Sequence, residues 1–204
     1  MMAVDLPVWA GCAMRSNIRM LKAANLPVPR LAVNLAALRA SMAKRPMRGA
    51  LLLGVAVGAI NFLTFVPLAL AAVALFTPQQ LGGSAAAALR GASTATVFCF
   101  VVVWAPLFET VIGQWLPLEI LRRYKVRAAV SLLASAALFS LLHVVNGAGI
   151  LHAIITFIGG CTFAASYLTA RSMGLAPAYV AAATAHACSN GLLLCLSLLF
   201  PALA

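Results

Sequence analysis

Beyond about residue 49, the chain consists of long apolar runs that are almost free of charge. Hydrophobic residues make up 64% of the 204 residues and charged residues only 8%, whereas a soluble domain carries about a quarter charged residues. A transmembrane helix needs about 20 apolar residues, and the runs lack the alternation of a barrel strand. We therefore predict an all-α, polytopic membrane bundle with five transmembrane helices at about 50–76, 94–120, 128–146, 150–170 and 175–199.

The basic residues predict the orientation of this bundle. Of 14 lysines and arginines, eight lie in the first 48 positions and four lie between Arg122 and Arg127. Cytoplasmic segments carry an excess of lysine and arginine, so we expect the amino terminus in the cytoplasm. The same clustering near predicted membrane boundaries explains the net charge of +11 without nucleic acid as a partner.

Residues 1–48 form the first of two predicted regions, a basic leader that precedes a transmembrane domain over 49–204. Apolar side chains recur there at helical spacing beside basic ones, at Leu31, Leu35, Leu38 and Met42. A basic amphipathic helix binds an anionic membrane surface, so we predict anionic lipid as a partner of this region. The alternatives are a solvated tail or a start site placed too early.

Three ionisable side chains, Glu109, His143 and His186, lie inside the apolar runs. Such a group at bilayer depth costs about 2.5–3.5 kcal/mol and indicates a functional site. Counted from the cytoplasmic helix ends at 1.5 Å per residue, they lie at roughly 16–22 Å, and Asn190 at roughly 22 Å. All four therefore fall in one layer of the membrane and can meet.

Two other polar residues are predicted to stand outside this layer. His152 lies roughly 27 Å from the cytoplasmic end of its helix, which predicts an interfacial histidine apart from the others. Glu119 precedes Arg122 and Arg123 by three and four residues, which predicts a helical ion pair near the surface.

Small residues predict where the helices approach closely. Pairs or series at four-residue spacing occur at Gly54 and Gly58, at Ser131 and Ser135, and at Thr156, Gly160 and Ala164. Pro106 lacks a backbone donor and should leave the carbonyl of Val102 without its helical partner. The five cysteines, at 12, 99, 161, 188 and 195, show no metal-ligand spacing and are expected to be packing residues.

Three short motifs resemble those of the CPBP family, which includes type II CaaX prenyl endopeptidases and bacterial Abi proteins. They are LFETVIGQ with Glu109, FSLLH from Phe139 to His143, and HACSN from His186 to Asn190. The family pattern is EExxxR, then FxxxH, then HxxxN or HxxxD, and the resemblance covers about 93–199. It implies a multi-pass protein of a bacterial cytoplasmic membrane that acts as an intramembrane glutamic protease.

The first motif departs from the family pattern at two positions. Thr110 stands where the second glutamate would be, and Gln114 stands where the arginine would be. The departure removes a charge pair that could position substrate. It bears on specificity for a prenylated tail more than on peptide hydrolysis.

The resemblance implies a metal-independent mechanism without a cofactor. Glu109 would take a proton from water, His143 would hold that water, and His186 and Asn190 would donate to the oxyanion. The substrate would be a membrane-embedded or lipidated peptide or protein. Rival interpretations are a zinc peptidase, a non-proteolytic membrane interaction or immunity protein with the same fold, and a small proton-coupled transporter.

Overall fold

The computed structural model describes residues 40–77, 89, 91–146 and 149–200. Its regular structure is helical throughout these residues, and five helices are long and apolar enough to cross a membrane. They are α3 (Pro46–Leu75), a composite helix (Thr94–Arg123), α8 (Ala128–Val145), α9 (Ile150–Ala170) and α10 (Leu175–Leu199). The predicted all-α fold with five spans is confirmed, while the side on which the amino terminus lies stays a prediction.

Most of the predicted leader lies outside the described residues. Only 40–48 are described, and they comprise a helical segment at 40–44 and the start of α3. The predicted lipid-binding face at Leu31, Leu35 and Leu38 is therefore outside the described part.

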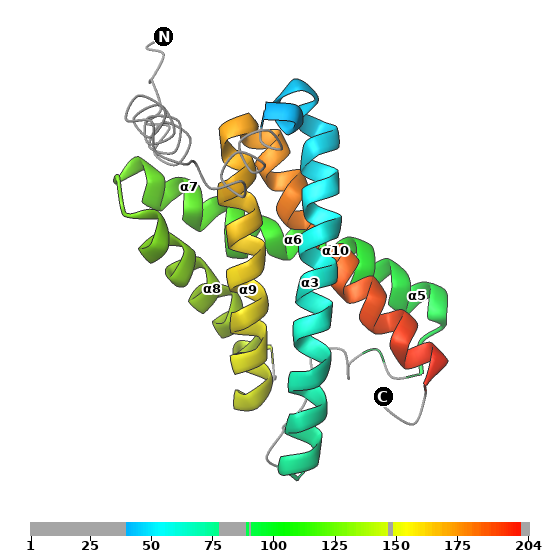
Figure 1. Ribbon diagram of the computed structural model, residues 1–204. Coiled ribbons are helices and arrows are strands. Elements are labelled where there is room, and N and C mark those ends of the chain that lie inside the picture. The colour runs from blue at the N-terminus through cyan, green and yellow to red at the C-terminus, as the bar shows by residue number, and fades with distance from the viewer. Residues whose placement is uncertain (1–39, 78–88, 90, 147–148, 201–204) are drawn as a thin grey trace, which may run out of the picture.

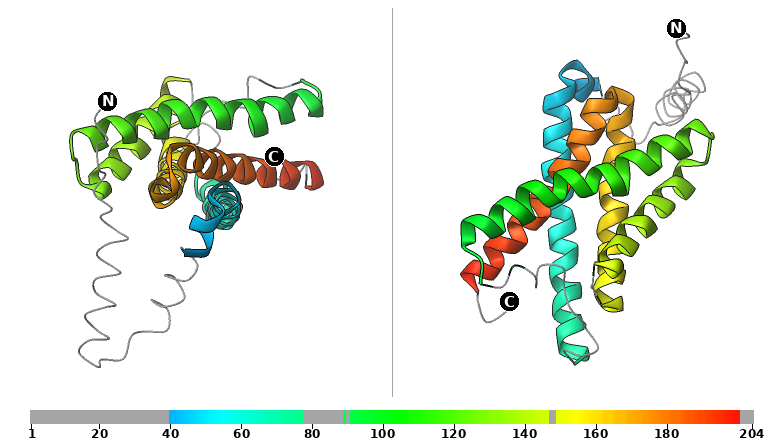
Figure 2. Two further views of the ribbon diagram at one scale, coloured as in Figure 1. Left: turned by 90° about the horizontal axis from the view of Figure 1, so that it is seen from above. Right: turned by 180° about the vertical axis from the view of Figure 1, so that it is seen from behind.

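Helix α10 packs against α3, α9 and the middle of the composite helix. In Figure 1, α3 and α9 stand upright next to each other, and the composite helix crosses them obliquely. Figure 2 shows from above that the composite helix runs along one side of the bundle, with α10 between it and α3. Gly174 permits the reversal from α9 into α10 because its φ of 128° is one that side chains with a Cβ rarely adopt.

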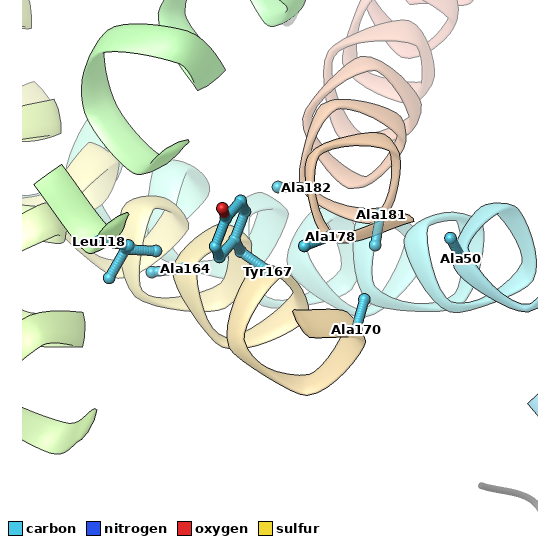
Figure 3. Close-up of a cluster of buried hydrophobic side chains, with 8 residues drawn as sticks. All are labelled: Ala50, Leu118, Ala164, Tyr167, Ala170, Ala178, Ala181 and Ala182. Atoms are coloured by element: carbon cyan, nitrogen blue, oxygen red, sulfur yellow. The ribbon is translucent and has the colours of Figure 1, made fainter. Parts of the chain in front are cut away.

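Small side chains allow this close packing. One core cluster is largely alanine, drawn in Figure 3, and joins α3, the composite helix, α9 and α10 through Ala50, Leu118, Ala164, Tyr167, Ala170, Ala178, Ala181 and Ala182. A Cβ on Gly54 would lie 2.6 Å from the Cβ of Thr184, and one on Gly58 would lie 2.5 Å from the carbonyl oxygen of Ala185. The predicted glycine contact is thus the interface between α3 and α10.

The other predicted small residues join α8 to its neighbours. Ser135 donates a hydrogen bond of 2.6 Å to the carbonyl of Gly113 in the composite helix. A Cβ on Gly160 of α9 would lie 3.0 Å from the Cα of Ala136. These contacts bring α8 against both the composite helix and α9.

The composite helix is irregular in two places. It consists of α5 (Thr94–Phe98), the π-helix η2 (Cys99–Trp104), α6 (Ala105–Thr110), the π-helix η3 (Val111–Trp115) and α7 (Leu116–Arg123). The N–H of Ala105 donates to the carbonyl of Phe100, five residues back. π-Helical turns of this kind occur frequently at functional sites. Here they flank the six residues of α6, which contain Pro106 and Glu109.

An ionic network closes one end of the bundle. Oε2 of Glu119 lies 2.7 Å from Nη2 of Arg122, and Oε1 accepts from Nε of Arg171 at 2.7 Å and from the hydroxyl of Tyr167 at 2.9 Å. Arg171 belongs to the short 3-10 helix η4 (Arg171–Met173) that follows α9. The predicted pair with Arg122 is confirmed, but the second arginine comes from η4 and not from position 123. Glu119 therefore links the composite helix to α9 and η4.

Candidate active site

Glu109 faces two histidines that come from different helices. Its Oε2 lies 3.8 Å from Nε2 of His143 on α8 and 3.8 Å from Nε2 of His186 on α10. The Glu109 side chain is 33% exposed, whereas those of His143 and His186 are 16% and 4% exposed. The three ionisable residues singled out by their place in apolar runs therefore meet at one point.

The hydrogen bond made by His143 determines which of its nitrogens carries a proton when the ring is neutral. Its Nδ1 lies 2.9 Å from the carbonyl oxygen of Phe139, one turn earlier on α8. A carbonyl can only accept, so Nδ1 carries the hydrogen. The Nε2 atom that faces Glu109 then presents a lone pair.

His186 has the opposite arrangement. Its ring stacks on Phe163 with centroids 4.7 Å apart and meets the edge of Phe139 at 5.4 Å. Its Nδ1 is buried without a hydrogen-bond partner among the described residues. A buried N–H without an acceptor is rarer than a buried acceptor without a donor, and on this ground we assign the hydrogen of the neutral ring to Nε2. His186 thus presents a donor toward Glu109, whereas His143 presents an acceptor.

Asn190 lies beside the same composite helix but at a different turn. Its Nδ2 donates a hydrogen bond of 2.9 Å to the carbonyl oxygen of Val101, eight residues before Glu109. The structure therefore groups three of the four predicted site residues around one carboxylate oxygen. It connects the fourth to the backbone that leads to that carboxylate.

The prediction that His152 stands apart is wrong with respect to His143, while its place at the membrane interface stays a prediction. Its ring centroid lies 6.1 Å from that of His143, and its side chain is half-buried. The short connection between α8 and α9 places the start of α9 beside the end of α8. The depths estimated from the sequence, roughly 22 Å for His143 and roughly 27 Å for His152, differ by only about 5 Å, which is compatible with contact between the two rings.

The two positions that depart from the family pattern are fully buried. Thr110 and Gln114 each have an exposed fraction of 0%. Within the described part of the chain, the Thr110 hydroxyl and both polar atoms of the Gln114 amide have no hydrogen-bond partner. Neither side chain is available to a substrate on the surface of the bundle.

The residues between His186 and Asn190 serve the packing of α10 against α3. Asn61 of α3 donates a hydrogen bond of 2.8 Å to the hydroxyl of Ser189. The amide oxygen of Asn61 accepts a hydrogen bond of 3.0 Å from Thr162 of α9. The thiol of Cys188 donates to the carbonyl of Val55 at 3.7 Å. Both side chains therefore bond to α3 and not to Glu109. The four cysteines in the described residues are free thiols, of which Cys99 and Cys195 are exposed.

An apolar hollow of about 330 Å³ lies between α8 and α9. It is lined by Ala137, Ser140, Leu141, Val144, Ile150, Ala153, Ile154 and Phe157. The one polar side chain in that lining, Ser140, donates to the carbonyl of Ala153 at 2.6 Å. The hollow itself therefore offers no catalytic group. No three histidine, cysteine or acidic side chains of the described residues are arranged to hold a metal ion.

A family model described as Type II CAAX prenyl endopeptidase Rce1-like matches residues 91–192. The match comprises half of the chain and contains the glutamate, both histidines and the asparagine discussed above. The chain belongs to this family. Comparison with curated proteins and with solved structures gave no match.

Membership in the Rce1-like family and the five apolar helices point to the same location for this protein. The protein is an integral, multi-pass membrane protein. Its family is that of CAAX-type intramembrane endopeptidases.

Proposed function

We propose that this protein is an intramembrane glutamic endopeptidase in which Glu109 activates a water molecule. The observation that carries the proposal is the pair of 3.8 Å distances from one carboxylate oxygen to two histidines of opposite hydrogen-bonding character. A separation of 3.8 Å is too long for a direct hydrogen bond. It suits a water molecule that makes hydrogen bonds of about 2.8 Å to its neighbours.

In the proposed reaction, the water donates one hydrogen to Glu109 and the other to the lone pair on Nε2 of His143. Glu109 takes a proton as the water oxygen bonds to the carbonyl carbon of the peptide. The N–H on Nε2 of His186 donates to the oxygen that becomes negative. Glu109 then returns its proton to the amide nitrogen as the carbon–nitrogen bond breaks, which leaves a new carboxylic acid that keeps the second hydrogen of the water, and a new amine.

Burial and stacking support the role of His186 as a fixed donor. A catalytic donor stabilises a developing charge most when its orientation is fixed before the reaction. The ring of His186 is only 4% exposed on the side chain and lies against Phe139 and Phe163. The role predicted for Asn190, donation to the oxyanion, stays a prediction. Its amide carries two N–H groups, of which one is bound to Val101.

The proposed substrate is a membrane-embedded or lipidated peptide. The description of the matching family names prenylated CAAX tails, which makes a peptide with an isoprenoid thioether near its carboxyl end the first substrate to test. Thr110 and Gln114 lack charge, so the protein would recognise such a tail without the charge pair of the family motif.

The test is hydrolysis by purified protein in liposomes. A fluorogenic peptide ending in a farnesylated CaaX sequence would be compared with the same peptide lacking the lipid. We expect cleavage by wild type and none by Glu109→Gln. Equal cleavage by both proteins would contradict the proposal, because the carboxylate would then not be the base.

A second candidate function is a non-proteolytic membrane interaction or immunity protein. The uncharged, buried Thr110 and Gln114 favour it, because they replace the charge pair of the proteolytic pattern. This candidate predicts that Glu109→Gln leaves the biological phenotype unchanged, whereas the protease proposal predicts that the phenotype is lost.

A further inference from the structure

We propose that Asn190 and Tyr179 of α10 are positioning residues for Glu109. They bind two backbone carbonyls whose regular α-helical donors bond elsewhere. The inference rests on the proposed function, because it concerns how the carboxylate of Glu109 is aimed. Tyr179 donates its hydroxyl to the carbonyl of Leu107 at 2.9 Å, and Asn190 donates its amide to the carbonyl of Val101 at 2.9 Å.

The carbonyl of Val101 loses its helical donors for two independent reasons. In a regular α-helix, the N–H of Ala105 would donate to it, but that N–H donates to Phe100 instead. In a continued π-helix, the donor would come from residue 106, which is a proline and has no N–H. The effect of Pro106 on the carbonyl of Val102 stays a prediction, and the carbonyl bound from outside the helix is that of Val101. Within a membrane, a backbone carbonyl without a donor is costly, and Asn190 supplies one.

The carbonyl of Leu107 is released by a different irregularity. An α-helix would pair it with the N–H of Val111, but that N–H donates to Phe108, three residues back. The hydroxyl of Tyr179 takes the place of this missing donor. Each bond thus lies where the helix leaves its regular pattern, one before Pro106 and one just before Glu109.

Both donors share a face of α10 with His186. Residues 179, 186 and 190 are spaced by seven and four, which places them in one stripe along a helix. The same surface of α10 therefore presents a catalytic histidine and holds the backbone on both sides of Pro106. This arrangement fixes the direction of the Glu109 side chain relative to the ring of His186. An error of about 1 Å in such a geometry can cost on the order of 100-fold in rate.

The decisive experiment uses the missing N–H of Pro106. Asn190→Leu keeps the size of the side chain but removes the donor, and we expect kcat to fall on the order of 100-fold with KM little changed. Pro106→Ala supplies an N–H that can reach the carbonyl of Val101 in the π-helical pattern. The double variant Asn190→Leu/Pro106→Ala should therefore recover most of the lost kcat. A double variant as inactive as Asn190→Leu would overturn the inference and would favour direct donation from Asn190 to the oxyanion.

Tyr179→Phe is the matched control, because the hydroxyl that it removes bonds to Leu107 and not to Val101. We expect kcat to fall about tenfold, the value of one net hydrogen bond. Pro106→Ala should not restore it, since the new N–H reaches Val101 and not Leu107. Rescue of Tyr179→Phe by Pro106→Ala would show a general effect on stability and would overturn the inference. So would wild-type kcat in both Tyr179→Phe and Asn190→Leu, a result that stands even if Pro106→Ala does not fold.

Melting temperatures separate this inference from the proposed function. All kcat values would be measured well below the Tm of each variant, so that a loss of folded protein cannot imitate a loss of positioning. If wild type cleaves no peptide, the proposed function fails, but the bond to Val101 can still be tested. Asn190→Leu should then lower the Tm less in the Pro106→Ala background than in wild type. Equal Tm losses in the two backgrounds would overturn the bond as well.

Discussion

Nε2 of His143 and Oε2 of Glu109 lie 3.8 Å apart, although they belong to separate membrane helices. Two contacts near Gly113 bring these helices together. Ser135 donates to the carbonyl of Gly113, and the absent side chain of Gly113 makes room for the ring of Phe139. Phe139 in turn contacts the ring of His143 at 4.7 Å between centroids. Packing of α8 against η3 thus sets the distance between the proposed base and its histidine.

Gly113→Ala should lower activity because its Cβ would lie 2.8 Å from the ring of Phe139. That ring is buried against both site histidines, so it cannot move without moving them. We expect a loss of about 1–3 kcal/mol in stability, as for other overpacked cores, together with a lower kcat. Gly54→Ala is the control, since it overpacks the α3–α10 interface and should lower the Tm with kcat unchanged. Equal kcat losses in the two variants would contradict the account.

The two histidines should respond differently to glutamine. In His186→Gln, the amide keeps a donor near the position of Nε2, so we expect a loss of about tenfold in kcat, as for one weakened hydrogen bond. In His143→Gln, a flexible amide replaces an acceptor that the bond between Nδ1 and the Phe139 carbonyl holds in place, so the water loses its fixed position and we expect a loss on the order of 100-fold. Steady-state cleavage in liposomes measures both. The reverse order of losses would show that the assigned tautomers are incorrect.

Removing the negative charge of Glu119 should destabilise the bundle without altering the chemistry. Glu119→Gln weakens the hydrogen bonds to Arg122, Arg171 and Tyr167, and bonds to charged groups contribute about 1.5–3 kcal/mol each. We expect a lower Tm, measured in detergent by tryptophan fluorescence, and a kcat close to wild type at low temperature. A variant with unchanged Tm would show that the network adds no stability.

Chelation separates the glutamic mechanism from a zinc peptidase. We expect that 1,10-phenanthroline and EDTA leave peptide cleavage by the purified protein unchanged, because the proposed base is Glu109 itself. As a control, the same treatment must abolish cleavage by a known zinc protease in the same liposomes. Loss of activity restored by added Zn²⁺ would contradict the proposal and would make His143 and His186 ligand candidates.

Composition and apolar length were enough to predict the five helices, because the membrane dictates both. Depth counting predicted that Glu109, His143 and His186 could meet, because in a bilayer each helix position corresponds to a height. Depth alone does not give the direction in which a side chain points. The His143–His152 contact and the bond between Glu119 and Arg171 depend on that direction, and sequence reasoning missed them.

The bond of Asn190 to Val101 could not be predicted, because it depends on a π-helical pattern that the sequence does not reveal. In a straight α-helix, a proline at position 106 deprives Val102 of its donor, so sequence reasoning points to that carbonyl and not to the one of Val101. Only the observed pairing of Ala105 with Phe100 identifies Val101 as the free acceptor. Sequence patterns therefore do not predict the part of this site that depends on irregular helical hydrogen bonding.

The central claim is that Glu109 makes this protein a protease. The most direct measurement compares newly formed protein termini in membranes of cells that produce wild type or Glu109→Gln at matched, correctly inserted levels. The account predicts a set of termini that occurs only with wild type, and those termini would identify the substrate. Indistinguishable sets of termini would contradict the claim and would favour the non-proteolytic interaction protein.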